Sequence, residues 1–97
     1  MFISIDVGAT HIRIAGTKSL EKPKLDLLTK IDTLDNYPED LENIGKVIGS
    51  VGPVSGVTLG APGLINEDRT QAGTLNLRTW LGKNLKSDFE NKFGCRV

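Results

Sequence analysis

Apolar residues recur along the chain with two spacings, which predict strands in the first third and helices further on. Residues 2–7 and 11–16 are rich in β-branched and alternating apolar side chains, and the glycine turn between them predicts a hairpin. Over residues 38–49, apolar positions lie three or four apart, on one face of a helix. Residues 84–93 place an apolar side chain at every fourth position, and Gly94 is a natural end for this second amphipathic helix.

Further segments complete the expected order of elements. Residues 25–33 predict a third strand, although their spacing also fits a helix, and residues 54–60 predict a fourth. Residues 35–40 carry helix-start signals, with a proline near the first turn and acids at the positive end of the helix dipole. Residues 64–78 indicate a loop with short extended pieces, and residues 95–97 the opening of another strand. This β-β-β-α-β-α order indicates an α/β domain with a mixed sheet and packed helices.

Composition narrows the class of protein. The 97 residues suffice for one small domain, and 38% apolar with 25% charged residues is an ordinary globular mixture. Twelve basic residues balance twelve acidic ones, so no overall field attracts nucleic acid or an anionic membrane. The single Cys95 excludes an internal disulfide and is expected to be a small buried hydrophobe. No signal peptide or membrane span is recognised, so a cytoplasmic location is expected.

The first candidate for chemistry is the turn that contains Asp6, Gly8 and Thr10. An aspartate at a strand end suits Mg²⁺, a glycine lets phosphate oxygens approach backbone N–H groups, and threonine offers a hydroxyl donor. The alternative is a plain hairpin turn, which favours the same residue types. A Walker loop or a dinucleotide fingerprint requires a helix after the glycines, and the sequence predicts a strand there.

Two further segments are candidates for binding a ligand. Residues 60–63 combine two glycines with a proline after a strand, an arrangement that either presents backbone groups to a ligand or makes an ordinary turn. Thr74 and Asn76 carry groups that hydrogen-bond the hydroxyls of a polyol, and Trp80 follows them. The alternative is an asparagine in a turn and a tryptophan that fills the core.

Other residues with reactive or charged groups favour structural roles. His11 lies on a predicted strand, where a lone histidine is more often structural than a general base. The second helix carries Lys83, Lys86 and Lys92 on or near its surface, and these predict a solvated face rather than an anion site.

The three motifs, in this order, resemble a known family. Residues 3–10 are similar to the first phosphate loop of the superfamily of sugar kinases, actin and heat-shock ATPases. Residues 60–65 and 76–82, followed by the helix at 84–93, resemble the ROK family (repressor, open reading frame, kinase), which includes bacterial glucokinases. The resemblance implies a ribonuclease H-like (actin-like ATPase) α/β fold, with residues 1–97 forming part of the N-terminal domain.

The resemblance also implies an activity, namely ATP-dependent phosphorylation of a hexose or amino-sugar hydroxyl with Mg²⁺. Asp6 would lie near the metal, and Gly8 and Thr10 would contact the β- and γ-phosphates. The residues implied to face the sugar are Gly63, Thr74 and Asn76.

Some features depart from the family pattern. His11 stands where the family often has lysine or asparagine, and Ala9 replaces a frequent glycine. The family's catalytic aspartate, in a Glu-Asn-Asp segment, would follow Val97, and the nucleotide-binding half of such kinases has no counterpart among these residues. The 97 residues alone are therefore expected to be inactive, and an exposed sheet edge is expected to favour a homo-oligomer.

Two other functions stay open at this point. A ROK-type transcriptional repressor would bind sugar and act through DNA, but such proteins carry a helix-turn-helix domain before the first strand. Here that strand begins at residue 2 and the net charge is zero, so binding to nucleic acid is not expected. The third function is a non-catalytic actin-like module that makes protein contacts.

Overall fold

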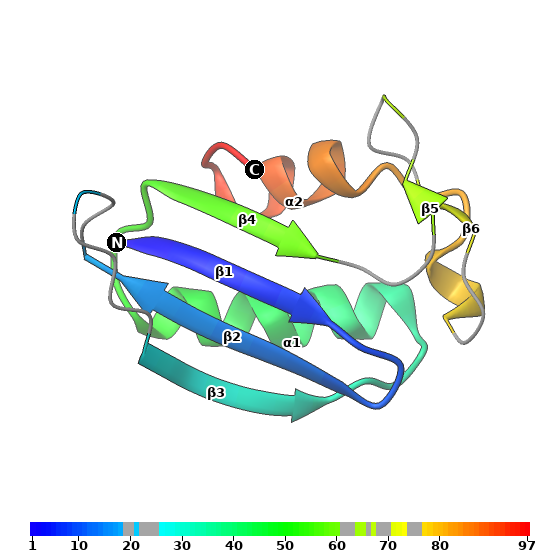
Figure 1. Cartoon of the computed structure of the whole chain (residues 1–97), viewed down its shortest axis with the longest axis horizontal. Helices are drawn as coiled ribbons and strands as arrows, with labels where there is room; N and C mark the ends of the chain where they lie inside the picture. Colours follow the sequence, from blue (N-terminus) through cyan, green and yellow to red (C-terminus); the bar gives the residue numbers. More distant parts are fainter. Residues whose placement is uncertain (19–20, 22–25, 61–63, 66, 68–70, 74–76) are drawn as a thin grey trace.

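A computed structural model describes residues 1–97 except 19–20, 22–25, 61–63, 66, 68–70 and 74–76, and Figure 1 shows its arrangement. Side chains are also left undescribed at 27, 64–65 and 71–73. The elements in chain order are β1 (Phe2–Val7), β2 (His11–Thr17), β3 (Asp26–Asp32), α1 (Tyr37–Ser50), β4 (Gly56–Gly60), β5 (Leu64–Ile65), β6 (Gln71–Gly73), the 3₁₀-helix η1 (Arg78–Trp80) and α2 (Leu85–Phe93).

The main sheet has four strands in the order β3-β2-β1-β4. β1 and β2 pair antiparallel, which confirms the predicted hairpin, and β4 lies parallel to β1 on its other side. The ambiguous segment is strand β3, paired antiparallel with β2, so the helical alternative is wrong. The fourth strand begins at Gly56 rather than at the predicted residue 54.

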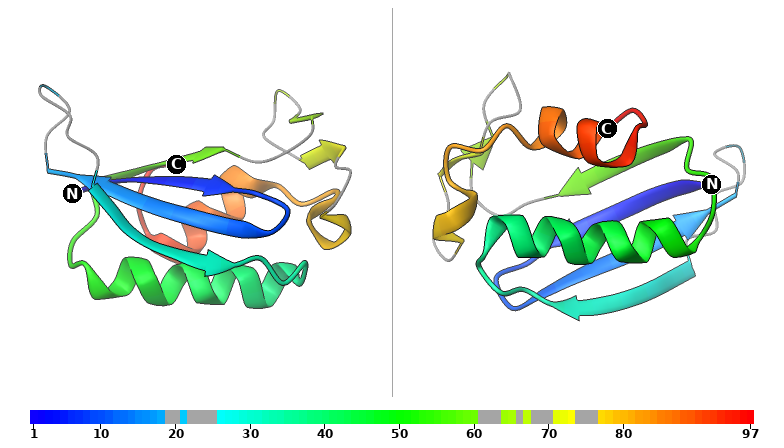
Figure 2. Two further views of the ribbon diagram at one scale, coloured as in Figure 1. Left: turned by 60° about the horizontal axis from the view of Figure 1, so that its bottom comes forward. Right: turned by 180° about the vertical axis from the view of Figure 1, so that it is seen from behind.

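Both helices cover the same face of this sheet, as Figure 2 shows from behind. Successive side chains of a strand point to opposite faces, so alternate residues of β1 and β2 enter the core beneath the helices. The buried apolar residues are Ile3, Ile5, Val7, Ile12, Ile14, Tyr37, Ile44, Ile48, Val57, Leu77, Trp80, Leu85 and Phe89. The predicted mixed sheet with packed helices is therefore confirmed.

Local signals place the helix ends. The Asn36 side chain accepts a hydrogen bond from the N–H of Glu39 at 3.2 Å and caps α1, which begins at Tyr37, one residue before the prediction. Pro38 lies in the first turn, where its missing N–H costs nothing. α2 ends at Gly94 in the left-handed conformation, with φ of 67°, as the sequence indicates.

The last residues add to the sheet beside β4. Gly56 and Arg96 form an isolated parallel bridge, and the N–H of Val57 donates to the carbonyl of Arg96 at 2.8 Å. The expected opening of another strand at 95–97 is thus confirmed. Cys95 is half-buried, and burial together with the charge of Glu90 raises the pKa of its thiol.

The described residues between β4 and α2 include the short extended pieces that the sequence predicts. β5 and β6 form a small antiparallel sheet, and η1 provides a single turn before α2. Among the described residues, no helix combines the length and the apolar character that crossing a membrane requires.

Candidate functional site

The turn between β1 and β2 is closed by a backbone hydrogen bond of its own and held by two more hydrogen bonds from Thr33. The N–H of Gly8 donates to the carbonyl of His11 at 2.9 Å. Thr33, which follows β3, donates its N–H to the carbonyl of Thr10 at 2.9 Å and its hydroxyl to the carbonyl of Gly8 at 2.8 Å. The turn that carries Ala9 and Thr10 is exposed at its tip and fixed at its base.

Gly8 is required by close packing of the backbone at this turn. A Cβ at Gly8 would lie 2.9 Å from the carbonyl oxygen of His11, a contact that real Cβ atoms essentially never make. We therefore expect Gly8→Ala to lower the free energy of unfolding by about 1–3 kcal/mol, since a backbone atom must move.

Urea denaturation would measure this loss, with Gly49→Ala as the matched control. Gly49 lies in α1, and a Cβ added there would have no heavy atom within 4 Å, so alanine should stabilise by about 0.5–1 kcal/mol. Equal effects of the two substitutions would contradict the steric argument.

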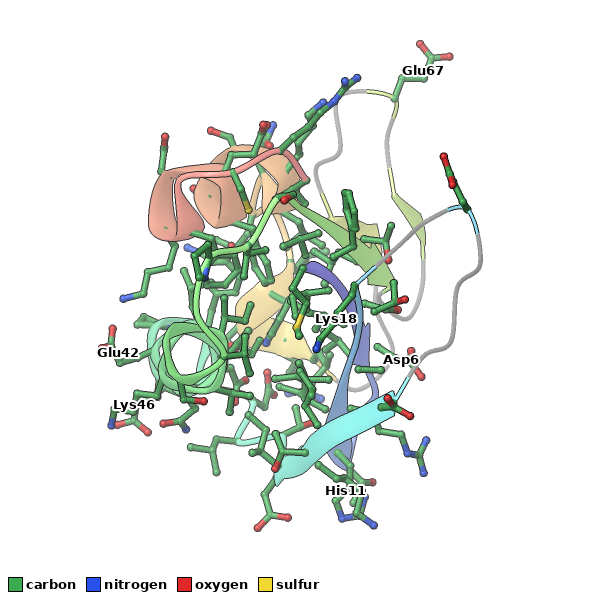
Figure 3. All side chains as sticks on the ribbon, turned by 90° about the vertical axis from the view of Figure 1, so that its left-hand side faces the viewer. Asp6, His11, Lys18, Glu42, Lys46 and Glu67 are labelled. Carbon is green, nitrogen blue, oxygen red and sulfur yellow. The ribbon has the colours of Figure 1, made fainter. Side chains whose placement is uncertain are left out.

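Asp6 lies at the carboxyl end of β1, where three strands meet. It pairs with Arg13 of β2 and with Gly60 of β4, and its side chain is exposed. A Cβ at Gly60 would lie 3.7 Å from Oδ1 of Asp6, so the carboxylate stands beside the end of β4. Figure 3 shows Asp6 on the face of the sheet away from α1, the helix marked by Glu42 and Lys46.

This arrangement groups the turn with the end of β4. Because β1 and β4 are parallel, their carboxyl ends lie at one edge, the edge at which open α/β sheets bind ligands. The start of α1 and the small β5–β6 sheet lie toward the same end of the molecule (Figure 1). The geometry therefore provides one exposed carboxylate next to a fixed glycine turn.

A single exposed carboxylate suits Mg²⁺ better than it suits zinc. The described residues contain no group of three His, Cys, Asp or Glu side chains that would hold a metal by themselves. Mg²⁺ is usually bound through one or two carboxylates while it keeps several waters and phosphate oxygens. Asp6 fits that pattern, whereas a zinc-type site would need more protein ligands.

His11 makes a contact that agrees with a structural role. Its Nε2 lies 3.7 Å from Oδ1 of Asp32 across β2 and β3, so the two form an ion pair when the imidazole is protonated. Asp32 is mostly exposed, so such a pair contributes little to stability.

The three residues expected to face the sugar, Gly63, Thr74 and Asn76, lie outside the described residues. The segment directly after Asn76 is described, and there Leu77 and Trp80 are buried. Trp80 packs edge-on against Tyr37, with ring centroids 5.0 Å apart. The interpretation of Trp80 as a core residue is confirmed.

Three side-chain contacts that the sequence does not reveal hold this region together. Oδ1 of Asp35 accepts hydrogen bonds from the N–H of Thr79 at 3.0 Å and from its hydroxyl at 2.9 Å. Oδ2 of Asp40 accepts from the indole Nε1 of Trp80 at 3.1 Å, and the Tyr37 hydroxyl donates to Asp88 at 2.8 Å. The partners lie 40 to 51 residues apart, so no local pattern could have found them.

These contacts also change ionisation. The hydrogen bonds from Thr79 hold the pKa of Asp35 below its ordinary value. Burial, followed by the hydrogen bond to Asp88, raises the pKa of the Tyr37 phenol. Both shifts favour the protonation states in which the observed hydrogen bonds form at neutral pH.

Two of the lysines on or near α2 also make contacts with α1. Lys92 forms an ion pair with Glu42 of α1, which lowers the pKa of Glu42. The Nζ of Lys83 lies 5.6 Å from the centroid of the Tyr37 ring. Lys83 and Lys92 are exposed, as predicted for a solvated face, although each also contacts α1, and Lys86 is half-buried.

Comparison with known proteins places the chain in a family. The sequence model of the family described as ROK matches residues 2–97, and the chain belongs to the ROK family. The search of individual curated proteins returned no match.

Solved structures show the same fold. A ROK family glucokinase from Streptomyces griseus, in complex with glucose and AMPPNP, superposes with a TM-score of 0.83 at 24% identity over 99% of this chain and 31% of its own. An inorganic polyphosphate/ATP-glucomannokinase from Arthrobacter gives 0.79 at 24% identity over 99% of this chain and 42% of its own.

A Listeria monocytogenes protein, proposed to be an N-acetylmannosamine kinase, gives a TM-score of 0.80 at 20% identity over 99% of this chain and 33% of its own. The chain thus spans about a third of the length of the first solved structures that it matches. The expected fold, a mixed sheet with two helices that matches part of the actin-like ATPase fold of these kinases, is confirmed.

Proposed function

We propose that these residues form part of the N-terminal domain of a sugar kinase that transfers the γ-phosphoryl group of ATP to a hydroxyl of a hexose or amino sugar. The observation that carries the proposal is the exposed Asp6 carboxylate beside the fixed turn at Gly8, at the carboxyl ends of parallel β1 and β4. Membership of the ROK family and the fold shared with sugar kinases support it.

The roles follow from the chemistry of the turn. Phosphoryl transfer requires positioning and neutralisation of phosphate charge more than covalent help from the protein. Asp6 would hold Mg²⁺ through its water shell, and the backbone at Gly8 and the hydroxyl of Thr10 would contact the β- and γ-phosphates. The sugar would contact Gly63, Thr74 and Asn76. Mg²⁺, when bound, would supply a positive charge at the phosphates.

The 97 residues by themselves are proposed to be inactive. They cover 33% and 31% of two of the matched chains, and the family resemblance implies that the catalytic aspartate is not among them. Without a base and a complete nucleotide site, the sugar hydroxyl and the γ-phosphate cannot be aligned. A homo-oligomer stays a prediction, which sedimentation at micromolar concentration would test.

The direct test is an ADP-release assay on the longer protein that contains this segment, with glucose, N-acetylmannosamine and fructose as substrates. Turnover with a sugar would support the kinase, and sugar binding without turnover would favour a regulator. Turnover by the 97-residue chain would refute the proposed inactivity of the segment.

The assignment of the sugar side has its own expected result. In the longer protein, Asn76→Ala should raise the sugar KM by about 10-fold, because one polar contact to the substrate is worth about 1 kcal/mol or somewhat more. The KM for ATP should change little. Asn91→Ala, on the exposed surface of α2, is the matched control and should leave both constants unchanged. Equal increases in both KM values would show that Asn76 is not a sugar contact.

A further inference from the structure

The segment between β3 and α1, residues 33–40 (the connector), makes contacts in two directions. At its start, Thr33 holds the turn, with its N–H on the carbonyl of Thr10 and its hydroxyl on the carbonyl of Gly8. The hydroxyl bond joins residues that lie 25 positions apart in the chain. Together the two bonds hold the side of the turn that faces β3. The position of the turn therefore depends on where the connector lies.

Two residues later, Asp35 of the connector forms hydrogen bonds with Thr79, in the segment that follows Asn76. Oδ1 of Asp35 accepts both the N–H and the hydroxyl of Thr79, and the same Thr79 oxygen accepts the N–H of Tyr37 at 3.1 Å. The Thr79 hydroxyl is thus both a donor and an acceptor between two points of the connector. Thr79 lies three positions after Asn76 in the chain.

The backbone between Thr33 and Asp35 is itself held in place. The N–H of Leu34 donates to Oδ1 of the buried Asp40 at 2.9 Å. Asp35 itself adopts a left-handed conformation, with φ of 51°, which aspartate tolerates better than most residues but which still costs energy. The hydrogen bonds from Thr79 offset the energetic cost of that conformation, and they also hold the pKa of Asp35 below its ordinary value.

We propose that the connector is a positioning element that sets the phosphate turn relative to the sugar side of the site, with Thr33 acting on the turn and the Asp35–Thr79 contact acting on the segment after Asn76. This inference rests on the proposed kinase function. A displacement of about 1 Å between reacting groups is enough to slow a transfer reaction strongly. The short connection that the Thr33 and Asp35–Thr79 hydrogen bonds make between the two sides (the tie) therefore affects the rate directly.

The test on the phosphate side is Thr33→Val in the longer kinase. Valine keeps the shape and the backbone N–H but removes the hydroxyl bond to Gly8, so kcat should fall about 2- to 12-fold while the sugar KM is unchanged. Thr33→Ser restores a hydroxyl and should recover most of the rate. Thr29→Val, on β3 itself, is the matched control and should have wild-type kinetics.

The test on the sugar side is Thr79→Val, which removes the hydroxyl that joins Asp35 to the N–H of Tyr37. The sugar KM should rise about 2- to 12-fold, with the KM for ATP unchanged. Asp35→Asn keeps an acceptor oxygen and tolerates the same backbone conformation, so it should change the sugar KM less than Asp35→Ala does. A merely structural role would instead lower Tm and shift all kinetic constants together, and that result would overturn the proposal.

Failure of the proposed function can be told apart from failure of the tie. A longer protein without turnover on any sugar would refute the kinase. The tie is judged separately in the 97-residue chain by amide hydrogen exchange at Gly8, which should be several-fold faster in Thr33→Val than in Thr29→Val. Equal exchange rates in the two variants would refute the tie, whatever the kinase assay shows.

Discussion

Asp40→Ala is expected to lower the free energy of unfolding of the chain by about 3–5 kcal/mol. Asp40 is fully buried and accepts hydrogen bonds from the N–H of Leu34 at 2.9 Å, the N–H of Asn36 at 3.3 Å and the indole of Trp80 at 3.1 Å. Alanine would leave three donors without their partner. The indole N–H of Trp80 is buried, where a lost partner costs about 1–3 kcal/mol, and the N–H groups of Leu34 and Asn36 are part-buried. Small domains are stable by only about 5–15 kcal/mol, so the variant should be close to unfolding.

Urea denaturation would measure this loss, followed by the fluorescence of Trp80 (the single tryptophan of the chain) and by far-UV circular dichroism. Glu39→Ala is the matched control, because Glu39 is the neighbouring acid in the first turn of α1 but is exposed. It should change stability by no more than about 0.5 kcal/mol. If both variants lose the same stability, the effect belongs to helix charge and not to the buried hydrogen bonds.

The largest expected effect on activity is that of Asp6→Ala in the longer protein, which we propose to be a sugar kinase. We expect kcat/KM for ATP to fall by at least about 10- to 150-fold, because one hydrogen bond to a charged group is worth about 1.5–3 kcal/mol. The Mg²⁺ concentration that gives half-maximal rate should rise, since the carboxylate would no longer attract the metal with its waters.

Steady-state kinetics at varied ATP and Mg²⁺ would measure both changes. Asp26→Ala, an exposed carboxylate at the start of β3, is the control and should keep wild-type kinetics. Wild-type kinetics in Asp6→Ala would mean that residues 6–10 form an ordinary hairpin turn and that the metal binds elsewhere.

Stability and activity are thus predicted to depend on different carboxylates. Asp6 is exposed at the end of a strand, where water and a metal can reach it, whereas Asp40 is enclosed and has all its described contacts within the protein. Burial, more than residue type, separates a candidate ligand from a structural group. The sequence indicates Asp6 as a candidate through the turn that it begins, but it shows Asp40 simply as an acid in the first turn of a helix, with no sign of its burial.

Elements whose signals are local could be predicted from the amino-acid sequence without the structure. The hairpin of β1 and β2, both helices and the glycine end of α2 follow from side-chain spacing and from turn or cap residues that lie next to one another. The Asp6–Thr10 turn was found for the same reason, because its residues are contiguous. The family motifs were recognisable because their order along the chain is itself a sequence property.

Features that depend on distant partners became visible only in the folded chain. β3 is a strand because it can pair with β2, although its own spacing also fits a helix. Thr33 meets Gly8 across 25 residues, Asp40 meets Trp80 across 40 and Asp35 meets Thr79 across 44. Such contacts form when the sheet and helices pack, since a hydrogen bond between side chains so far apart needs the rest of the fold to bring them together.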